Sequence, residues 1–335
     1  IVDAGLTTTP MHTFIVNRIS ADGGAMITAS HNPAQFNGIK LTGRHGVISE
    51  GSGMEAVAQM AMRGIFEEES TKGSVREENF LPAYISFFAD HFPALRDPHA
   101  FGGKPLRIAL DSGDGMTGIL LSPLFEQFLS IEPVIIHKGL NMSFPHHEAN
   151  PIKPETLRDL QKMVIKKKCD LGAAFDGDGD RLGIIDERGA YILSDMIIAV
   201  LASHYVKDVF NSVIVCDPCI SRIVREEIEY HKGRVIETRV GPPFLKGVMR
   251  KEGALFGGES NGHYYFKDFF YSESALFALF TLLSILKKEK TTLHALVAPL
   301  YRYSKSEEIN MPFFNKKNTD ILFQHIASHF SDSMI

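Results

Sequence analysis

The chain is predicted to fold into consecutive, related α/β domains with mixed, largely parallel sheets. Apolar strand-like segments alternate with amphipathic helix-like segments along most of its 335 residues, and this alternation is typical of βαβ units. Three successive segments repeat the same order of strand, Gly- or Asp-containing turn and helix. A chain of this length can bury two or three separate cores.

Residues 1–98 form the first predicted domain, although its opening portion is expected to be incomplete. A strand is expected at 24–28, a polar loop at 29–37 and a helix-like stretch at 53–66. The acidic run Glu67–Glu69 is expected to form an exposed turn.

A Gly/Pro-rich break at 97–105 separates this domain from the second, at residues 99–190. The expected elements of the second domain, in chain order, are a strand at 106–111, a helix at 119–129, a strand at 133–139, a helix at 154–168 and a strand at 170–176.

Residues 191–302 form the third predicted domain. Its expected helices lie at 194–205, 221–231, 243–252 and 274–288, and its expected strands lie at 212–217, 234–240 and 254–259. Residues 303–335 are expected to begin a truncated C-terminal domain, with a helix at 318–330.

The composition indicates a globular protein, with 44% hydrophobic and 22% charged residues. A formal net charge of −5 argues against nucleic acid or an acidic membrane as partner. The apolar run Ala275–Leu286 is too short to cross a bilayer and predicts a core helix. Three cysteines fit a reducing compartment, which we expect to be the cytoplasm, and Cys216 and Cys219 are interpreted as packed thiols rather than a zinc or redox pair.

The motif "FDGDGDR" is the strongest chemical signal in the chain. Its carboxylates Asp176, Asp178 and Asp180 alternate with glycine, so the backbone can curl and direct all three at one cation. Three hard oxygen ligands suit one Mg²⁺ per chain. The calcium EF-hand loop is disfavoured because Arg181 occupies the sixth position, where that loop needs glycine. A solvated acidic turn is disfavoured because crowded carboxylates repel one another.

Two further loops carry polar groups at the ends of strands. "ITASHNPAQFNGIK" presents Ser30 beside His31 and places Lys40 at the start of the next strand. Ser30 lacks the GxSxG surroundings of a hydrolase elbow, so it suits phosphate transfer better than acyl transfer. "GGESNGH" crowds Glu259, Ser260, Asn261 and His263 into one turn that suits sugar hydroxyls, although a plain polar turn between strands is the default interpretation of this motif alone.

The motifs "TASHNP", "DGDGDR" and "GGESNGH", in this order, resemble the α-D-phosphohexomutase family, which includes phosphomannomutase/phosphoglucomutase enzymes. "DSGDGMTG" and "FPHHEANPIKPE" look like second-domain segments of that family. The resemblance implies that Ser30 is phosphorylated in the resting enzyme and that its phosphate completes the coordination of magnesium. It further implies catalytic roles for His31, Lys40 and Arg181, and sugar recognition by Glu259, Asn261 and His263.

The implied reaction moves phosphate reversibly between C1 and C6 of a mannose or glucose phosphate. The phosphoserine gives its phosphate to the hexose monophosphate, and the bisphosphate that forms returns its other phosphate to the serine. Hexose phosphates are therefore the expected partners, and glucose or mannose 1,6-bisphosphate is the expected activator. The oligomeric state is left open.

The chain departs from the family pattern at several points. Asn261 stands where serine is usual, and "YSESA" replaces an Asp-Gly pair. An R-x-S-G-T string, which grips the substrate's second phosphate in a fourth domain, does not occur in the printed sequence. We therefore expect reduced or no turnover from this chain alone. The alternatives are a phosphoglucosamine mutase, a non-catalytic sugar-phosphate-binding paralogue and, third, a metal-dependent phosphatase.

The adjacent histidines His146 and His147 could be taken for a metal-binding pair. Neighbouring residues on an extended segment point to opposite faces, so they are interpreted instead as polar groups of a loop.

Overall fold

The computed structural model describes residues 1–43, 46–47, 53–64, 66, 70–207, 209–305 and 316–329. Residues 1–303 form one compact unit and residues 304–335 a second, and each is described separately. The predicted domain boundaries at 98, 190 and 302 stay a prediction. The predicted acidic turn at 67–69 and the segment 307–314 lie outside the described residues.

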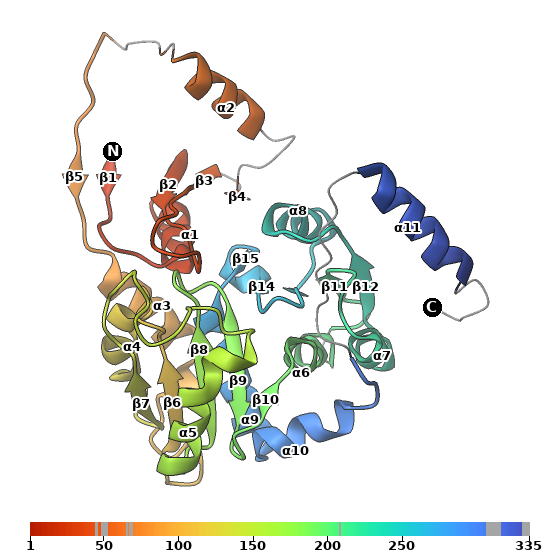
Figure 1. Cartoon of the computed structure of the whole chain (residues 1–335). Helices are drawn as coiled ribbons and strands as arrows, with labels where there is room; N and C mark the ends of the chain where they lie inside the picture. Colours follow the sequence, from red (N-terminus) through yellow and green to blue (C-terminus); the bar gives the residue numbers. More distant parts are fainter. Residues whose placement is uncertain are drawn as a thin grey trace. The chain divides into compact units, whose positions relative to one another are not determined.

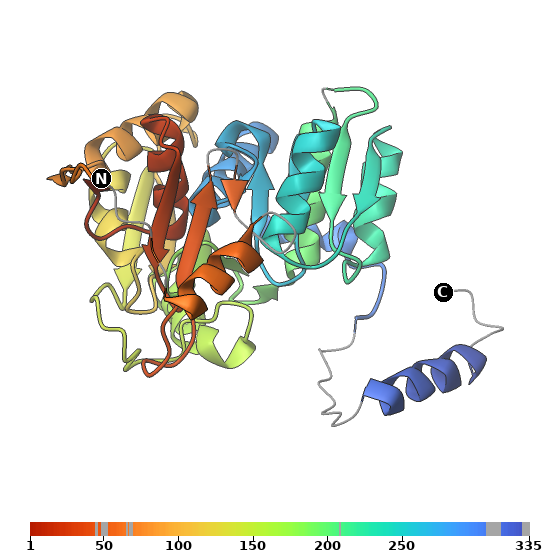
Figure 2. The same cartoon turned by 90° about the horizontal axis from the view of Figure 1, so that it is seen from above.

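The first segment, residues 1–98, contains a small antiparallel sheet, a short parallel strand pair and, among its described residues, the α-helices α1, α2 and α3. Strands β2, β3 and β4 pair antiparallel, while β1 and β5 pair parallel. Helix α1 lies against β2 (Figures 1 and 2). The elements are β1 Val2–Asp3, α1 Thr9–Arg18, β2 Gly23–Ile27, β3 Ile39–Gly43, β4 Gly46–Val47, α2 Met54–Arg63, β5 Arg76–Glu77 and α3 Leu81–His91.

Helices α1 and α3 were not predicted from the sequence. Helix α1 begins where the Thr8 hydroxyl accepts a hydrogen bond from the Met11 backbone N–H at 3.2 Å, and Pro10 occupies its first turn. Helix α3 packs through Phe88 against Phe280 of the third segment, with ring centroids 5.3 Å apart. Tertiary packing therefore stabilises α3 more than its own sequence indicates.

The second segment is a three-layer α/β/α arrangement around the sheet β10-β9-β8-β6-β7 (Figure 1). Ile108 and Leu110 of β6 point into one core with α4, while Ala109 between them points into another with α5. The elements are β6 Leu106–Asp111, α4 Gly118–Phe125, β7 Ile131–Ile136, α5 Arg158–Lys167, β8 Leu171–Phe175, β9 Leu182–Asp186 and β10 Tyr191–Ile192.

The third segment repeats this plan around the sheet β12-β11-β13-β14-β15. Ile214 of β11 packs with α6 and α7, and Val215 faces α8 on the opposite side. The elements are α6 Ser194–Lys207, β11 Val213–Cys216, α7 Arg222–Tyr230, β12 Arg234–Glu237, α8 Pro242–Glu252, β13 Phe256–Gly258, β14 Tyr264–Phe266, β15 Ser272–Glu273, α9 Ala275–Glu289 and α10 Leu293–Val297.

The prediction of α/β domains with mixed sheets is confirmed, but the expectation that they are largely parallel is wrong, because the described strands of the two five-stranded sheets pair antiparallel as often as parallel. In the second segment β6 pairs parallel with β7 and β8, whereas β9 joins β8 and β10 antiparallel. In the third, β11 pairs parallel with β12 and β13, and β14 pairs antiparallel with β13 and β15. The predicted core helix is α9, which Ser274 caps by accepting from the Phe277 N–H at 3.1 Å.

The second unit contains helix α11, Lys316–His329. Among the described residues, we find no helix with the length and apolar character that a bilayer crossing requires. Of the three cysteines, Cys169 and Cys216 are buried whereas Cys219 is exposed.

Candidate active site

Three connections between antiparallel strands meet at the candidate site. The β8–β9 loop carries the carboxylate motif, the β2–β3 loop carries Ser30, and the β13–β14 loop carries the polar turn at 259–263. Arg181 and His263 form an antiparallel bridge that joins the first and third of these loops. Strand pairing therefore gathers motifs that lie far apart in the sequence.

The carboxylates of Asp176, Asp178 and Asp180 are almost completely buried, with exposures of 0%, 1% and 3%. One oxygen of each lies within 4.8 Å of the others. Three negative charges at this spacing repel unless cations join them. Oδ1 of Asp178 is buried without a hydrogen-bond partner among the described residues, so its lone pairs are available to a cation. This donor set fits Mg²⁺, which prefers carboxylate oxygens.

Ser30 lies directly beside this cluster. Its Oγ donates to Oδ2 of Asp176 at 3.1 Å and also lies 3.1 Å from Nδ1 of His31. Its backbone has a φ of 55°, in the left-handed region that serine rarely adopts. The Ser30 N–H donates to Oγ1 of Thr28 at 2.9 Å, which holds the turn in this conformation. Backbone strain of this kind is often stored where a side chain must be presented.

Lys40 supplies a positive charge to the same cluster. It lies opposite Met26 in the β2–β3 pair, and its Nζ lies 2.7 Å from Oδ2 of Asp178 and 2.9 Å from Oδ2 of Asp180. Burial favours a lower pKa for Lys40, but the carboxylates of Asp180 and Asp178 outweigh it and raise the pKa above its usual range. Lys40 therefore stays protonated and offsets part of the negative charge.

The pKa values of Asp176 and Asp180 are shifted in opposite directions. Burial, together with the charges of Asp180 and Asp178, raises the pKa of Asp176 well above its usual range. Burial acts in the same direction on Asp180, but the nearby Lys40 and His263 lower its pKa well below the usual range. Without a metal ion, Asp180 therefore carries its charge more firmly than Asp176.

Two threonines that the sequence analysis did not single out also bind the cluster. The hydroxyls of Thr9 and Thr28 donate to Oδ2 of Asp178 at 2.8 and 3.1 Å. The Thr9 N–H, at the start of α1, donates to the Asp178 carbonyl oxygen at 2.9 Å. The run "TTTP" could have indicated the start of a helix, but no local signal shows that Thr9 contacts Asp178, which lies 169 residues along the chain.

The polar turn at 259–263 is largely engaged in internal bonds. Oε1 of Glu259 accepts from the Gly241 N–H at 2.7 Å, and Oε2 accepts from the Tyr265 hydroxyl at 2.6 Å. Nδ1 of His263 lies 2.9 Å from Oδ1 of Asn261. Glu259 is completely buried, and of these predicted sugar ligands Asn261 is the most accessible.

His263 and Arg181 connect this turn to the carboxylates. Nε2 of His263 lies 3.2 Å from Oδ1 of Asp180, and its Nδ1 lies 3.1 Å from Oε2 of Glu259. Burial disfavours the charged ring, but Asp180 and Glu259 raise the pKa of His263 to about 10. Nε of Arg181 lies 3.9 Å from Oδ2 of Asp176. All the predicted site residues thus belong to one connected group.

Three family models match the chain in sequence order. They are phosphoglucomutase/phosphomannomutase α/β/α domain I at residues 1–68, domain II at 82–189 and domain III at 194–303. The three models together cover most of the unit in which the site lies.

Comparison with individual proteins supports the same family as the three family models. The chain is 30% identical to a phosphomannomutase of Vibrio cholerae, over 100% of this chain and 72% of that protein. It is 33% identical to a phosphomannomutase of Methanocaldococcus jannaschii, over 98% and 71%. A crystal structure of a phosphoglucomutase/phosphomannomutase family protein from Burkholderia thailandensis superimposes with a TM-score of 0.76 at 26% identity, over 89% of this chain and 64% of that one.

The fold and the family matches place the chain in a class of isomerases, the intramolecular phosphotransferases. The chain belongs to the phosphoglucomutase/phosphomannomutase family, whose enzymes are α-D-phosphohexomutases. The resemblance inferred from the sequence motifs is thereby confirmed. The chain spans 64–72% of the length of the three relatives named above.

Proposed function

We propose that this chain carries the phosphoryl-transfer centre of a phosphomannomutase/phosphoglucomutase, with Ser30 as the phosphate carrier. The supporting observation is the 3.1 Å contact between Oγ of Ser30 and Oδ2 of Asp176, at the edge of three buried carboxylates. Asp176, Asp178 and Asp180 would hold one Mg²⁺ together with the Ser30 phosphate. That ion would offset charge on the transferring phosphoryl group.

The proposed reaction transfers phosphate in two steps, from Ser30 to the sugar and from the sugar back to Ser30. A hydroxyl oxygen of the hexose monophosphate attacks phosphorus, the bond from phosphorus to Oγ of Ser30 breaks, and a hexose 1,6-bisphosphate forms. In the return step, Oγ of Ser30 takes the other phosphate from the bisphosphate. Glucose or mannose 1,6-bisphosphate would therefore also charge an unphosphorylated chain.

Oγ of Ser30 must gain a proton as it gives up phosphate and release one as it takes phosphate back, and His31 is the better placed group for this exchange. Its Nδ1 lies 3.1 Å from Oγ of Ser30, and burial together with Arg181 lowers the pKa of its ring. Nζ of Lys40 is instead held by two carboxylates at 2.7 and 2.9 Å. Of the two candidates, we assign proton transfer to His31 and charge neutralisation to Lys40.

Sugar recognition is assigned to the turn at 259–263. Asn261 offers an amide donor and acceptor from a half-buried position. Glu259 and His263, which are buried and bonded to each other, would position Asn261 and orient the turn. The alternative, a non-catalytic protein that binds sugar phosphate, keeps this turn but needs no phosphate on Ser30.

The test is intact-protein mass after incubation with glucose 1,6-bisphosphate and Mg²⁺, followed by peptide mapping. We expect one added phosphate on Ser30, lost again when glucose 6-phosphate or mannose 6-phosphate is supplied. Ser30→Ala should gain none, whereas Ser86→Ala, at an exposed serine of α3, should behave like the wild type. If Ser30 stays unmodified while hexose phosphate still binds, the non-catalytic alternative replaces the mutase.

A further inference from the structure

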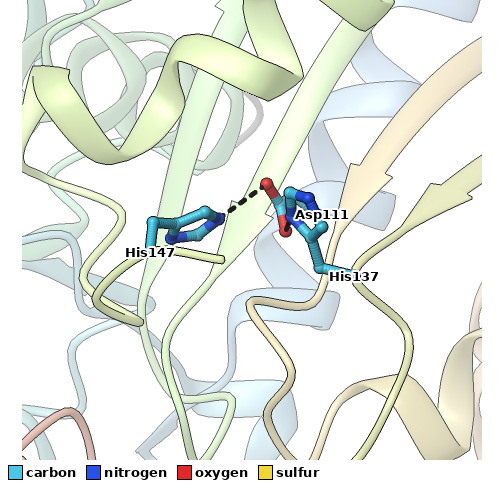
Figure 3. Close-up of side chains that lie close together, drawn as sticks. All are labelled: Asp111, His137 and His147. Atoms are coloured by element: carbon cyan, nitrogen blue, oxygen red, sulfur yellow. Dashed lines mark hydrogen bonds and ion pairs between the residues drawn. The ribbon is translucent and has the colours of Figure 1, made fainter. Parts of the chain in front are cut away.

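A second cluster of ionisable side chains lies outside the proposed active site. Asp111 ends β6, His137 follows β7, and His147 lies in the loop before α5. Figure 3 shows the Asp111 carboxylate between the two imidazole rings, which reach it from different segments. One ligand atom from each of the three residues lies within 4.8 Å of the others.

Each oxygen of Asp111 faces one ring nitrogen. Nδ1 of His137 lies 3.0 Å from Oδ1, and Nε2 of His147 lies 3.1 Å from Oδ2. The Asp111 side chain has no exposed surface, whereas those of His137 and His147 retain 12% and 14%. The carboxylate therefore forms the inner wall of the cluster, and the rings form a side that solvent reaches.

The second ring nitrogen of His147 also faces an acceptor. Nδ1 of His147 lies 2.8 Å from the carbonyl oxygen of Glu148, which can only accept, so this nitrogen carries a hydrogen. Nε2 of a neutral His147 then directs a lone pair at a carboxylate oxygen, so a second proton or a cation must lie between them. Nε2 of His137 lies 3.9 Å from Oδ2 of Asp159, which is beyond hydrogen-bonding distance, so only His147 has its outer nitrogen bound to an acceptor. An acceptor on the outer nitrogen is the usual arrangement of metal-binding histidine.

We propose that Asp111, His137 and His147 form a second metal site, selective for a divalent transition metal of the Zn²⁺ class. Two imidazole nitrogens and one carboxylate oxygen suit Zn²⁺ or Co²⁺ rather than Mg²⁺. Ligands at about 2.0–2.2 Å from such an ion lie roughly 3.3–3.5 Å apart. His137 and His147 contact different oxygens of Asp111, at 3.0 and 3.1 Å, and one ligand atom of each residue lies within 4.8 Å of the others, so the side chains must move closer together to reach that spacing around one ion.

The neighbouring histidine does not belong to this site. Nδ1 of His146 lies 2.6 Å from Oδ2 of Asp114, so His146 and His147 contact different acids, as their predicted opposite directions require. The expectation that both are plain loop groups overlooked His137, which reaches Asp111 from 26 residues along the chain. The metal partner of His147 is therefore not its sequence neighbour.

The proposed site has a structural link to the active-site loop. The turn that follows Asp111 contacts the carboxylate motif, because the Met116 N–H donates to the Gly177 carbonyl oxygen at 2.9 Å. An ion on Asp111 would restrain this turn. The proposal depends on the side-chain geometry and not on the mutase reaction.

The competing explanation is an ion pair in which a proton takes the place of the metal. Burial disfavours a charged ring, but Asp111 raises the pKa of His147 to about 9. Metal titration separates the two explanations. The whole chain is stripped with a chelator, saturated with Mg²⁺ to occupy the three-aspartate cluster, and titrated with Co²⁺ at pH 8, with the visible absorption of Co²⁺ as readout.

We expect one Co²⁺ per chain with the intense visible bands of a low-coordinate site, and displacement by Zn²⁺ but not by excess Mg²⁺. His137→Gln and His147→Gln should each weaken binding at least tenfold. His294→Gln is the matched control, because Nδ1 of His294 pairs with Oδ2 of Asp186 at 3.2 Å outside the cluster. It should bind Co²⁺ like the wild type.

A zinc X-ray absorption spectrum of the wild-type protein gives a second readout that requires no variant to fold. Two imidazole ligands per zinc would support the site. An absence of Co²⁺ binding in the presence of Mg²⁺, or Co²⁺ binding that His137→Gln and His147→Gln leave unchanged, would overturn the proposal in favour of the ion pair.

Discussion

Gly177 lies against Ser30 so closely that a Cβ at residue 177 would be 2.3 Å from the Ser30 carbonyl oxygen. The two residues belong to different loops, and the carboxylate of Asp176 accepts from Ser30 in the same region. The glycine between the first two aspartates therefore does more than let the loop curl. It provides the space into which the Ser30 turn fits.

Gly177→Ala is expected to displace the Ser30 turn, because the new methyl group meets backbone rather than a flexible side chain. Phosphorylation of Ser30 by glucose 1,6-bisphosphate should fall by at least tenfold, and the free energy of unfolding should fall by about 1–3 kcal/mol. The mass assay measures the phosphorylation of Ser30, and urea denaturation measures the free energy of unfolding. Gly247→Ala is the control, because a Cβ at this position of α8 meets no atom within 4 Å. It should leave phosphorylation unchanged and stabilise slightly; equal losses in the two variants would contradict the close contact.

Asp178→Asn should separate metal affinity from folding. The amide oxygen can still accept from Thr9, Thr28 and Lys40, so the stability of the metal-free protein should change by less than about 1 kcal/mol. The rise in melting temperature that Mg²⁺ produces in the wild type should disappear, because the free Oδ1 of Asp178 is replaced by an amide nitrogen. An unchanged response to Mg²⁺ would show that the three aspartates are not the magnesium ligands.

Lys40→Met removes the cation that bridges Asp178 and Asp180. In chelator, the variant should lose about 1–3 kcal/mol of stability, a loss moderated because the Lys40 side chain is 37% exposed. Added Mg²⁺ should restore more stability to the variant than to the wild type, because it relieves a larger repulsion. Thermal melts with and without Mg²⁺ measure both effects. Lys162→Met, at an exposed ion pair of α5, is the control and should show neither.

The His263–Asp180 pair should make stability depend on alkaline pH in the metal-free protein. His263 has a pKa of about 10 in the folded state, above its ordinary value of 6.5. A raised folded-state pKa contributes stability fully below pH 6.5, and that stability is lost as the pH rises through about 10. Urea unfolding in chelator between pH 6.5 and 10 should show a decline of a few kcal/mol, on the order expected for such a shift.

His263→Gln should flatten this alkaline decline, because glutamine keeps a polar contact but does not titrate. A control substitution at exposed His99, outside the site, should leave the decline intact. If His263→Gln and the wild type lose stability in parallel above pH 6.5, the ring is not held in its charged form by Asp180.

Much of the fold, and the motifs that contribute to the candidate site, could be predicted from local patterns. The strand before the carboxylate motif, the core helix α9 and the loop that carries Ser30 after β2 all follow from apolar periodicity and from the placement of turn residues. Helices α1 and α3 were missed. Phe88 of α3 finds its partner Phe280 almost two hundred residues along the chain, a contact that no local pattern indicates.

By itself, the sequence determined the class of fold and marked the three aspartates and, through the family resemblance, Ser30 as candidate-site residues, because each motif is a short local run. Only the tertiary structure brought Ser30 to Asp176, which lies 146 residues along the chain. Tertiary structure alone decided that Lys40 neutralises Asp178 across 138 residues, and that Glu259 is held by Tyr265 and Gly241. It also decided that His147 joins His137 at Asp111. These contacts arise when separate hairpins and strand ends pack together, and the geometry of that packing depends on the whole core rather than on any single segment.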